Sequence, residues 1–318
     1  AKSLLKVKGE DTFLDLIVRQ VKHLRSISGT PVRLLLMNSF STSADTLAYL
    51  EKYAADGFAD RAEVELLQNC VPKILADSLS PASCPEQPEL EWCPPGHGDL
   101  YPALLGSGWL DRLLEDGVKY AFVSNSDNLG AQLDMNFLRW FAESGAPFVM
   151  EVTRRTEADR KGGHLAVRKS DGQLILREVA QCPDEDIPEF QNISRHRYFN
   201  TNTLWIRLDA LKEILDANGG VLPLPMIRNK KTLNPRDPES APVYQLETAM
   251  GAGIECFPGA RAVNVPRSRF FPVKTTSDLF LLRSDAIAVD EHGNVALAPE
   301  RQGNTPVVNL DSKLYKLV

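Results

Sequence analysis

The sequence predicts an α/β protein with a mixed, mainly parallel sheet flanked by helices. Short apolar runs alternate with helical patterns through the first half of the chain, which is typical of strand–helix–strand units. The run at 120–123, Tyr-Ala-Phe-Val, is apolar throughout, as expected for a central strand covered on both faces. Asn38, Gln68 and Asp127 follow predicted strands, at the edge where open α/β sheets bind ligands.

Hydrophobic spacing divides the first half into elements. Apolar residues recur on one helical face over residues 12–26, and Asp11 is placed to cap that helix. Residues 76–95 are rich in Pro, Ser and Glu, and we expect a long surface loop there. The other predicted elements are helices over 42–55, 107–115 and 134–144 and strands over 32–37, 63–68, 120–123 and 147–153.

The pattern in the second half of the sequence predicts a layer that extends this sheet and presents a second binding surface. A turn at 170–172, Ser-Asp-Gly, separates two of its strands. Residues 286–318 lack strong periodicity, apart from a possible hairpin around 291–294. The predicted elements are strands over 164–168, 173–179 and 203–208 and helices over 209–217, 245–252 and 275–284.

Composition excludes several classes of protein. The chain has 318 residues and a net charge of −6, is 43% hydrophobic and 25% charged, and carries no basic block of the kind nucleic-acid binders use. Its apolar runs are all shorter than a membrane span. Five cysteines without CxxC spacing, and histidines without a cysteine at ligand spacing, predict reduced thiols in a cytoplasmic protein rather than a zinc site.

The stretch at 94–101, PPGHGDLY, predicts a loop that comes close to a ligand. Gly96 and Gly98 lack a Cβ, so their amides can approach a ring or a phosphate closely. His97 between them can donate to a phosphate oxygen. The alternative is an ordinary surface turn, because Gly and Pro are turn residues.

A carboxylate and two lysines are candidates for binding phosphate groups and a metal. Asp127 ends a strand where a magnesium ion held by phosphates would need a carboxylate, although an Asx turn or helix cap is the alternative. Lys2 and Lys274 are candidate phosphate clamps. A solvated surface lysine is the alternative, which suits Lys274 less well because its neighbours are apolar.

Polar residues in the second half suggest a sugar site. Gly163 precedes a histidine in a Gly-Gly-His run, and Asn200 and Asn202 carry donors and acceptors that suit sugar hydroxyls. Glu178 lies in an otherwise apolar predicted strand and could accept hydrogen bonds from sugar hydroxyls. Turn chemistry is the alternative for the glycines and asparagines, and pairing with Arg177 is the alternative for Glu178.

Taken together, these stretches resemble the UTP–glucose-1-phosphate uridylyltransferase family (UDP-glucose pyrophosphorylases) of eukaryotic and protozoan type. They follow the family's order along the chain, and PLPMIRNKKT at 223–232 is most similar to trypanosomatid members. The matching stretches are LLLMNSF at 34–40, LLQNCVPKI at 66–74, PPGHGDLY at 94–101, FVSNSDNLGA at 122–131, MEVTRRTEADRKGGHLA at 150–166, FNTNTLWIRL at 199–208, YQLETAMGA at 244–252 and VPRSRFFPVKTTSDL at 265–279.

The resemblance implies a nucleotide-diphospho-sugar transferase fold, related to glycosyltransferase A and Rossmann-like folds. It implies transfer of uridylyl from UTP to glucose 1-phosphate, giving UDP-glucose and pyrophosphate with Mg2+, in a monomer or weak homo-oligomer. The implied roles are uracil recognition by Gln68 and Gly96 near Met37, phosphate contact by His97, magnesium binding by Asp127, sugar-phosphate contact by Asn125, glucose binding by Gly163, Glu178, Asn200 and Asn202, and phosphate bridging by Lys274 and Lys2.

The family pattern also implies what surrounds this chain. A Leu-Asn-Gly-Gly-Leu-Gly-Thr signature is expected just upstream of Lys2, and a β-helix after about residue 318. We therefore expect a catalytic core over 1–285 without its glycine-rich loop, and a segment over 286–318 leading to an absent β-helix domain.

Three other functions stay open on the sequence. One is a pyrophosphorylase for UDP-N-acetylglucosamine or many UDP-sugars, although His97, Asp99 and the Asn-Thr-Asn-Thr-Leu-Trp stretch favour glucose. The second is a non-catalytic nucleotide-sugar binding protein, which would need the cation set to be broken. The third, a scaffold, leaves the polar residues at the strand ends without a role.

Overall fold

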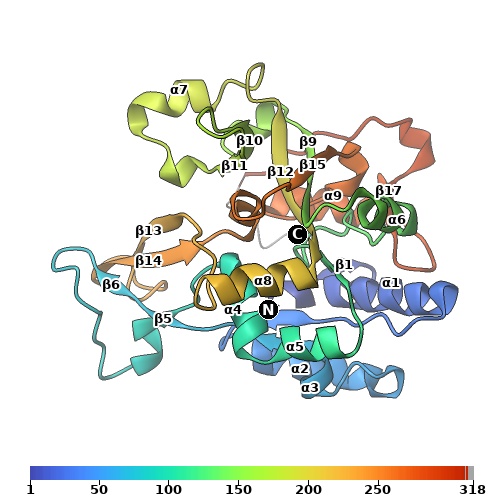
Figure 1. The fold of residues 1–318 in the computed structure, drawn as a ribbon, viewed down its shortest axis with the longest axis horizontal. Coiled ribbons are helices and arrows are strands. Elements are labelled where there is room, and N and C mark those ends of the chain that lie inside the picture. The colour runs from blue at the N-terminus through green and yellow to red at the C-terminus, as the bar shows by residue number, and fades with distance from the viewer. Residues whose placement is uncertain (312, 314–318) are drawn as a thin grey trace.

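A central mixed sheet organises the molecule in the computed structural model, which describes residues 1–311 and 313. The sheet has six strands in the order β11-β10-β12-β9-β15, with β8 paired to β12. Figure 1 shows β9, β10, β11, β12 and β15 in its upper half. Its strands are β8 (Tyr120–Val123), β9 (Phe148–Arg154), β10 (His164–Val167), β11 (Leu174–Arg177), β12 (Tyr198–Arg207) and β15 (Arg261–Asn264).

The prediction of a mainly parallel sheet is wrong. Among the described residues, β9 and β15 are the one parallel pair of neighbours in this sheet, and the other pairs are antiparallel. The helix α6 (Met135–Ser144) joins β8 to β9, as the sequence predicted, but β12 from the second half lies between these two strands and pairs with both. Local periodicity detects the strand–helix–strand unit, whereas the insertion of a distant strand depends on tertiary packing.

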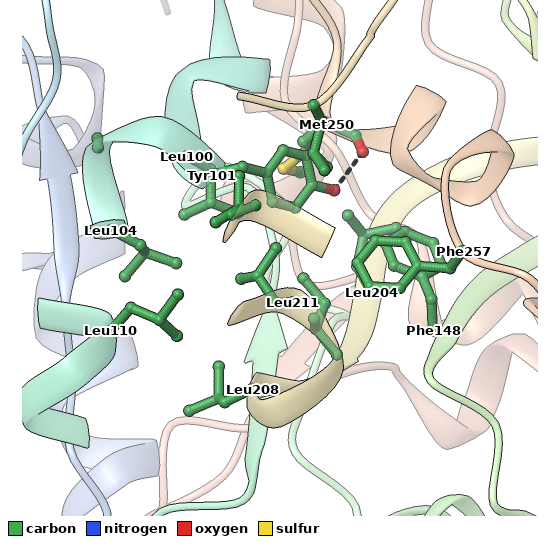
Figure 2. Packing of buried hydrophobic residues seen from close by; sticks show 14 of the residues in the cluster. Leu100, Tyr101, Leu104, Leu110, Phe148, Leu204, Leu208, Leu211, Met250 and Phe257 are labelled. Atoms are coloured by element: carbon green, nitrogen blue, oxygen red, sulfur yellow. Dashed lines mark hydrogen bonds between the residues drawn. The ribbon is translucent and has the colours of Figure 1, made fainter. Parts of the chain in front are cut away.

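Side chains alternate between the two faces of this sheet, and each face packs against helices. On one face, Phe148 and Leu204 pack with α4 (Leu100–Gly106), α5 (Trp109–Glu115) and α8 (Leu208–Ala217), and Figure 2 shows this core. Within it the buried Tyr101 hydroxyl donates to the carbonyl of Met250 at 2.5 Å. On the other face, Val149 and Trp205 pack against Phe141 of α6.

The long helix α1 (Phe13–Ser28) begins one residue later than predicted. Thr12, rather than Asp11, is its N-cap: the Thr12 hydroxyl accepts from the Asp15 amide, and Asp15 accepts from the Thr12 amide. Such a cap contributes about 1 kcal/mol. Asp11 instead pairs with Arg19 at 2.8 Å.

Between residues 94 and 252, one predicted helix is wrong and one helix of the structure was not predicted. The predicted helix over 245–252 is wrong, because β14 (Pro242–Thr248) pairs with β13 (Met226–Thr232) and β6 (Ile74–Leu75), and a short 3-10 helix, Met250–Glu255, follows. Cross-strand pairing overrides the local helical pattern there. Helix α4 was not predicted, because the Gly-rich loop precedes it directly.

The other predicted helices and strands are present, most of them with shifted ends, but the loop predicted over 76–95 contains a 3-10 helix, Pro88–Glu91, and the strand β7 (Trp92–Cys93). The hairpin around 291–294 is confirmed by β16 (Ile287–Val289) pairing with β17 (Val295–Leu297). No helix of the described chain is long and apolar enough to cross a membrane. The remaining helices are α2 (Ser43–Leu50), α3 (Arg61–Val64), α7 (Ile187–Phe190) and α9 (Thr276–Arg283). The remaining strands are β1 (Lys6–Lys8), β2 (Asp11–Thr12), β3 (Leu36–Asn38), β4 (Glu65–Leu67), β5 (Val71–Pro72), β7 (Trp92–Cys93), β16 (Ile287–Val289) and β17 (Val295–Leu297).

Of the predicted segment over 286–318, residues 312 and 314–318 lie outside the described residues.

Candidate functional site

A polar pocket of about 220 Å3 lies at the ends of β11 and β12. Six of the residues predicted for a site line it: Asn125, Gly163, Glu178, Asn200, Asn202 and Lys274. They come from five separate stretches of the chain. The other lining residues are Asn128, Lys161, Gly162, Phe199, Thr201, Phe270 and Pro272.

A β-bulge in β12 presents the asparagine pair. The register of β12 on β9 shifts between Asn200 and Thr203, and Asn202 adopts a left-handed φ of 57°. The Asn200 amide nitrogen donates to Asn202 Oδ1 at 2.9 Å, and the Asn202 main-chain N–H donates to Asn200 Oδ1 at 2.9 Å. Bulges next to binding sites redirect side chains, and Asn tolerates the left-handed region better than most residues. The turn chemistry that the sequence left as an alternative is therefore part of how the pocket is built.

Glu178 and Gly163 lie against each other in the wall of the pocket. A Cβ on Gly163 would lie 2.4 Å from Glu178 Oε1, so the carboxylate occupies the space that any other side chain would need. Burial raises the pKa of Glu178, and the positive charge of Lys274 opposes this shift. A carboxylate and an ammonium therefore line the same pocket.

Lys274 lies at the start of α9, where its main chain is fixed. Its N–H donates to Asp278 Oδ2 at 2.9 Å, and Thr275 and Asp278 form a capping box. Its side chain is exposed and lines the pocket. The main chain is therefore held in place, while the ammonium can reach a ligand.

Asp127 and Lys2 pair with each other. The Lys2 ammonium donates to Asp127 Oδ2 at 2.5 Å, and the Asp127 side chain is 18% exposed. No group of three or more metal-binding side chains gathers within the described residues. A single carboxylate fits Mg2+, because this ion is commonly bound by one or two carboxylates while phosphate oxygens and water supply the other ligands.

The Gly-rich loop packs directly on the end of β14. A Cβ on Gly98 would lie 2.3 Å from Thr248 Oγ1, and one on Gly96 would lie 2.6 Å from the Thr248 carbonyl. Gly96 also has φ +81°, and the Thr248 N–H donates to the Pro95 carbonyl at 2.9 Å. The glycines are therefore required for the loop to contact protein backbone as well as any ligand.

Hydrogen bonds arrange the polar side chains around this loop. Gln68 Nε2 donates to the Gly96 carbonyl at 2.6 Å, and His97 Nδ1 accepts from the Met250 N–H at 2.9 Å. In a neutral imidazole this leaves the proton on Nε2. Burial lowers the pKa of His97, which favours that neutral form. Met37 is half-buried on β3 and packs against the main core.

The structure adds residues that the sequence did not single out. Lys161 lines the pocket next to Gly162 and Gly163, and the Phe199 and Phe270 rings meet edge-on in its wall at a centroid distance of 5.2 Å. Lys161 could have been found from its place beside two glycines. The aromatic pair could not, because its members are 71 positions apart in the sequence (270 − 199 = 71) and meet only in the fold.

The sequence of the whole chain matches one protein family. A profile of the family described as UTP–glucose-1-phosphate uridylyltransferase matches residues 1–318. The chain belongs to this family. Its mixed α/β fold agrees with the one that the resemblance implied, whereas the mainly parallel strand direction predicted from the strand–helix alternation is wrong.

Individual relatives agree with this assignment. A UTP–glucose-1-phosphate uridylyltransferase of Saccharomyces cerevisiae is 46% identical over 317 residues, which is 99% of this chain and 62% of the yeast protein. That of Solanum tuberosum is 42% identical over 99% of this chain and 64% of its own length. The chain thus spans less than two thirds of these relatives.

Solved structures of two UDP-glucose pyrophosphorylase-type proteins superpose closely. The Trypanosoma brucei UDP-glucose phosphorylase gives a TM-score of 0.92 at 51% identity, covering 99% of this chain and 67% of that one. A Leishmania major UDP-glucose pyrophosphorylase mutant in complex with UDP-glucose gives 0.91 at 51% identity, covering 99% and 68%. These two structures therefore share the fold of this chain.

Proposed function

We propose that this protein transfers the uridylyl group of UTP to glucose 1-phosphate, releasing UDP-glucose and pyrophosphate. The observation that carries the proposal is the pocket that joins amides and a carboxylate, suited to sugar hydroxyls, to the ammonium of Lys274. Membership of the family supports the same reaction. A sugar phosphate needs both kinds of group at one place, whereas a scaffold needs neither.

The chemical problem in this reaction is charge rather than proton transfer. An oxygen of the phosphate of glucose 1-phosphate attacks the α-phosphorus of UTP, and the bond to the pyrophosphate oxygen breaks. The attacking oxygen is already anionic, so no general base is required. Lys274 and Lys2 would reduce the repulsion between the two anions and stabilise the charge at the phosphorus.

The sugar and the nucleotide would bind at opposite ends of this site. Asn200, Asn202 and Glu178, beside Gly163, would bond glucose hydroxyls, with Asn125 next to the phosphate. In the nucleotide end, Gln68 and Gly96 would recognise uracil near Met37. His97 would donate its Nε2–H to a phosphate as a neutral group, because Nδ1 is occupied by the Met250 amide.

Asp127 would hold a magnesium ion, and the ion would add positive charge at the phosphates. The conversion Asp127→Asn is expected to raise the Mg2+ concentration needed for half-maximal turnover by about 10-fold, since one charged ligand is lost. An unchanged magnesium titration would contradict this role. We further expect the protein to act in the cytoplasm, with residues 1–285 as the catalytic core, as a monomer or weak homo-oligomer.

A pyrophosphate-release assay with a panel of sugar 1-phosphates tests the function. Turnover with UTP and glucose 1-phosphate is expected to exceed that with the galactose and N-acetylglucosamine analogues by at least 10-fold in kcat/KM. Comparable turnover with all three would favour a broad-specificity pyrophosphorylase. Binding of UDP-glucose by calorimetry without any pyrophosphate release would make the protein a nucleotide-sugar binder instead.

A further inference from the structure

We propose that Asn128 is a positioning residue that sets the distance between Asp127 and Lys274. This inference rests on the proposed function, because it concerns how two of its charged groups are held together. Asn128 is next to Asp127, is 3% exposed and lines the pocket wall.

Both ends of the Asn128 amide are used by the chain that leads into Lys274. Its Oδ1 accepts from the Phe271 N–H at 2.8 Å, and its Nδ2 donates to the Arg269 carbonyl at 3.3 Å. The two contacts lie within five residues before Lys274 (274 − 269 = 5). The Asn128 side chain therefore holds this segment by two hydrogen bonds, one that it accepts and one that it donates.

Main-chain contacts continue the same connection. Asn128 forms a bridge with Pro272, and the Val273 N–H donates to the Asp127 carbonyl at 3.1 Å. The segment thus runs beside the Asp127 loop up to the residue before Lys274. The side chains of Asp127 and Lys274 lie on two backbones that are bonded to each other.

The segment is in turn fixed to the central sheet. Arg269 donates to both carboxylate oxygens of Glu151 on β9, each at 2.7 Å, and Glu151 is fully buried. The Arg269–Glu151 ion pair therefore fixes the start of the segment to the central sheet. Asn128 determines where the rest of the segment lies relative to the Asp127 loop. Loss of the amide would leave the Arg269–Glu151 ion pair intact and would remove the side-chain bonds that hold the Phe271 N–H and the Arg269 carbonyl against the Asp127 loop.

A small displacement matters because Lys274 acts by opposing charge at a defined place. A shift of about 1 Å in a reacting or charge-stabilising group can cost on the order of 100-fold in rate. A residue that contacted the substrate directly would instead act whether or not Lys274 was present. These two roles are separated by a double-mutant cycle.

The experiment compares Asn128→Ala, Lys274→Ala and the double variant in the natural full-length protein, by kcat and KM for glucose 1-phosphate. We expect Asn128→Ala to lower kcat by on the order of 10- to 100-fold. In the Lys274→Ala background, the same change is expected to lower kcat by less than about 3-fold. Thermal unfolding shows whether each variant folds, and Asn128→Asp keeps the acceptor for the Phe271 N–H if the alanine variant does not fold.

The matched control is Asn234→Ala, which removes a half-buried asparagine in the turn after β13, outside the pocket. Its kcat is expected to equal that of the wild type. Equal losses from Asn128→Ala with and without Lys274, or a change confined to KM, would overturn the inference. Absence of UDP-glucose formation by the wild type would instead reject the proposed function, so the two failures are distinct.

Discussion

The two ends of the proposed site, the Gly-rich loop proposed for the nucleotide and the pocket proposed for the sugar, are built in different ways. At the nucleotide end, the Gly-rich loop is packed against Thr248, and Gln68 and His97 are already bonded to backbone groups. At the sugar end, the side chains of Glu178 and Lys274 face a pocket of about 220 Å3. The Gly-rich loop is held by contacts with backbone atoms, whereas the pocket is formed by side chains that surround an open volume.

This difference predicts where substitutions act. A change in the loop should disturb the fold and the nucleotide together, because the same atoms serve both. A change in the pocket wall should alter the sugar or the chemistry while the fold persists. Four substitutions or conditions test this distinction.

The largest effect is expected from Lys274→Ala. Removal of a preorganised charge that stabilises the transition state typically costs on the order of 100-fold or more in kcat. Because the Lys274 side chain is exposed, the thermal unfolding midpoint should stay near that of the wild type. Steady-state kinetics checks this, with Lys169→Ala, an exposed lysine in the turn between β10 and β11, as the control. Wild-type turnover in Lys274→Ala would remove the residue from the mechanism.

At the nucleotide end, Gly98→Ala should lower both stability and nucleotide affinity. The added Cβ would lie 2.8 Å from the Thr248 carbonyl carbon as well as against its side chain. Overpacking of this kind costs about 1–3 kcal/mol of the free energy of unfolding. Urea unfolding and calorimetry with UTP measure the two quantities. A loss of affinity without any loss of stability would show that the loop and the fold are independent.

Low pH should destabilise β10, the strand that follows Gly163, through the buried His164. Burial, with the positive charges of His196, Arg155 and Arg177, lowers its pKa to about 3 from 6.5. Between these values the unfolded chain binds more protons, so the stability is complete above pH 6.5 and is lost as pH falls. From pH 7 to pH 5 this amounts to about 2 kcal/mol. The free energy of unfolding of His164→Gln should fall less steeply over that range, and parallel curves would refute the assignment.

The smallest effect is expected from Gly163→Ala at the sugar end. Its Cβ would displace the carboxylate of Glu178, which is a side chain and can move. We expect KM for glucose 1-phosphate to rise by about 10-fold, equal to 1.4 kcal/mol of binding, with little change in stability. Gly106→Ala is the control, because nothing lies within 4 Å of its added Cβ. Equal destabilisation by Gly163→Ala and Gly98→Ala would erase the difference between the two ends.

The sequence by itself determined the local elements and the family. Helical spacing placed α1, α6 and α9 within a few residues, and the quoted motifs marked the loops that carry Asp127, His97 and Lys274. These features depend on neighbours in the chain, such as caps, periodicity and glycine spacing. They can therefore be predicted without knowing which distant segments meet.

Tertiary structure alone decided the direction of the strands and the contacts across the site. The insertion of β12 between β8 and β9 made the sheet mostly antiparallel, and a bulge in the same strand aimed Asn200 and Asn202 into the pocket. The bonds from Asn128 to the segment before Lys274 join residues more than 140 positions apart (269 − 128 = 141). Such contacts form because each buried polar group must find a partner when the elements pack, and no local pattern specifies which partner that is.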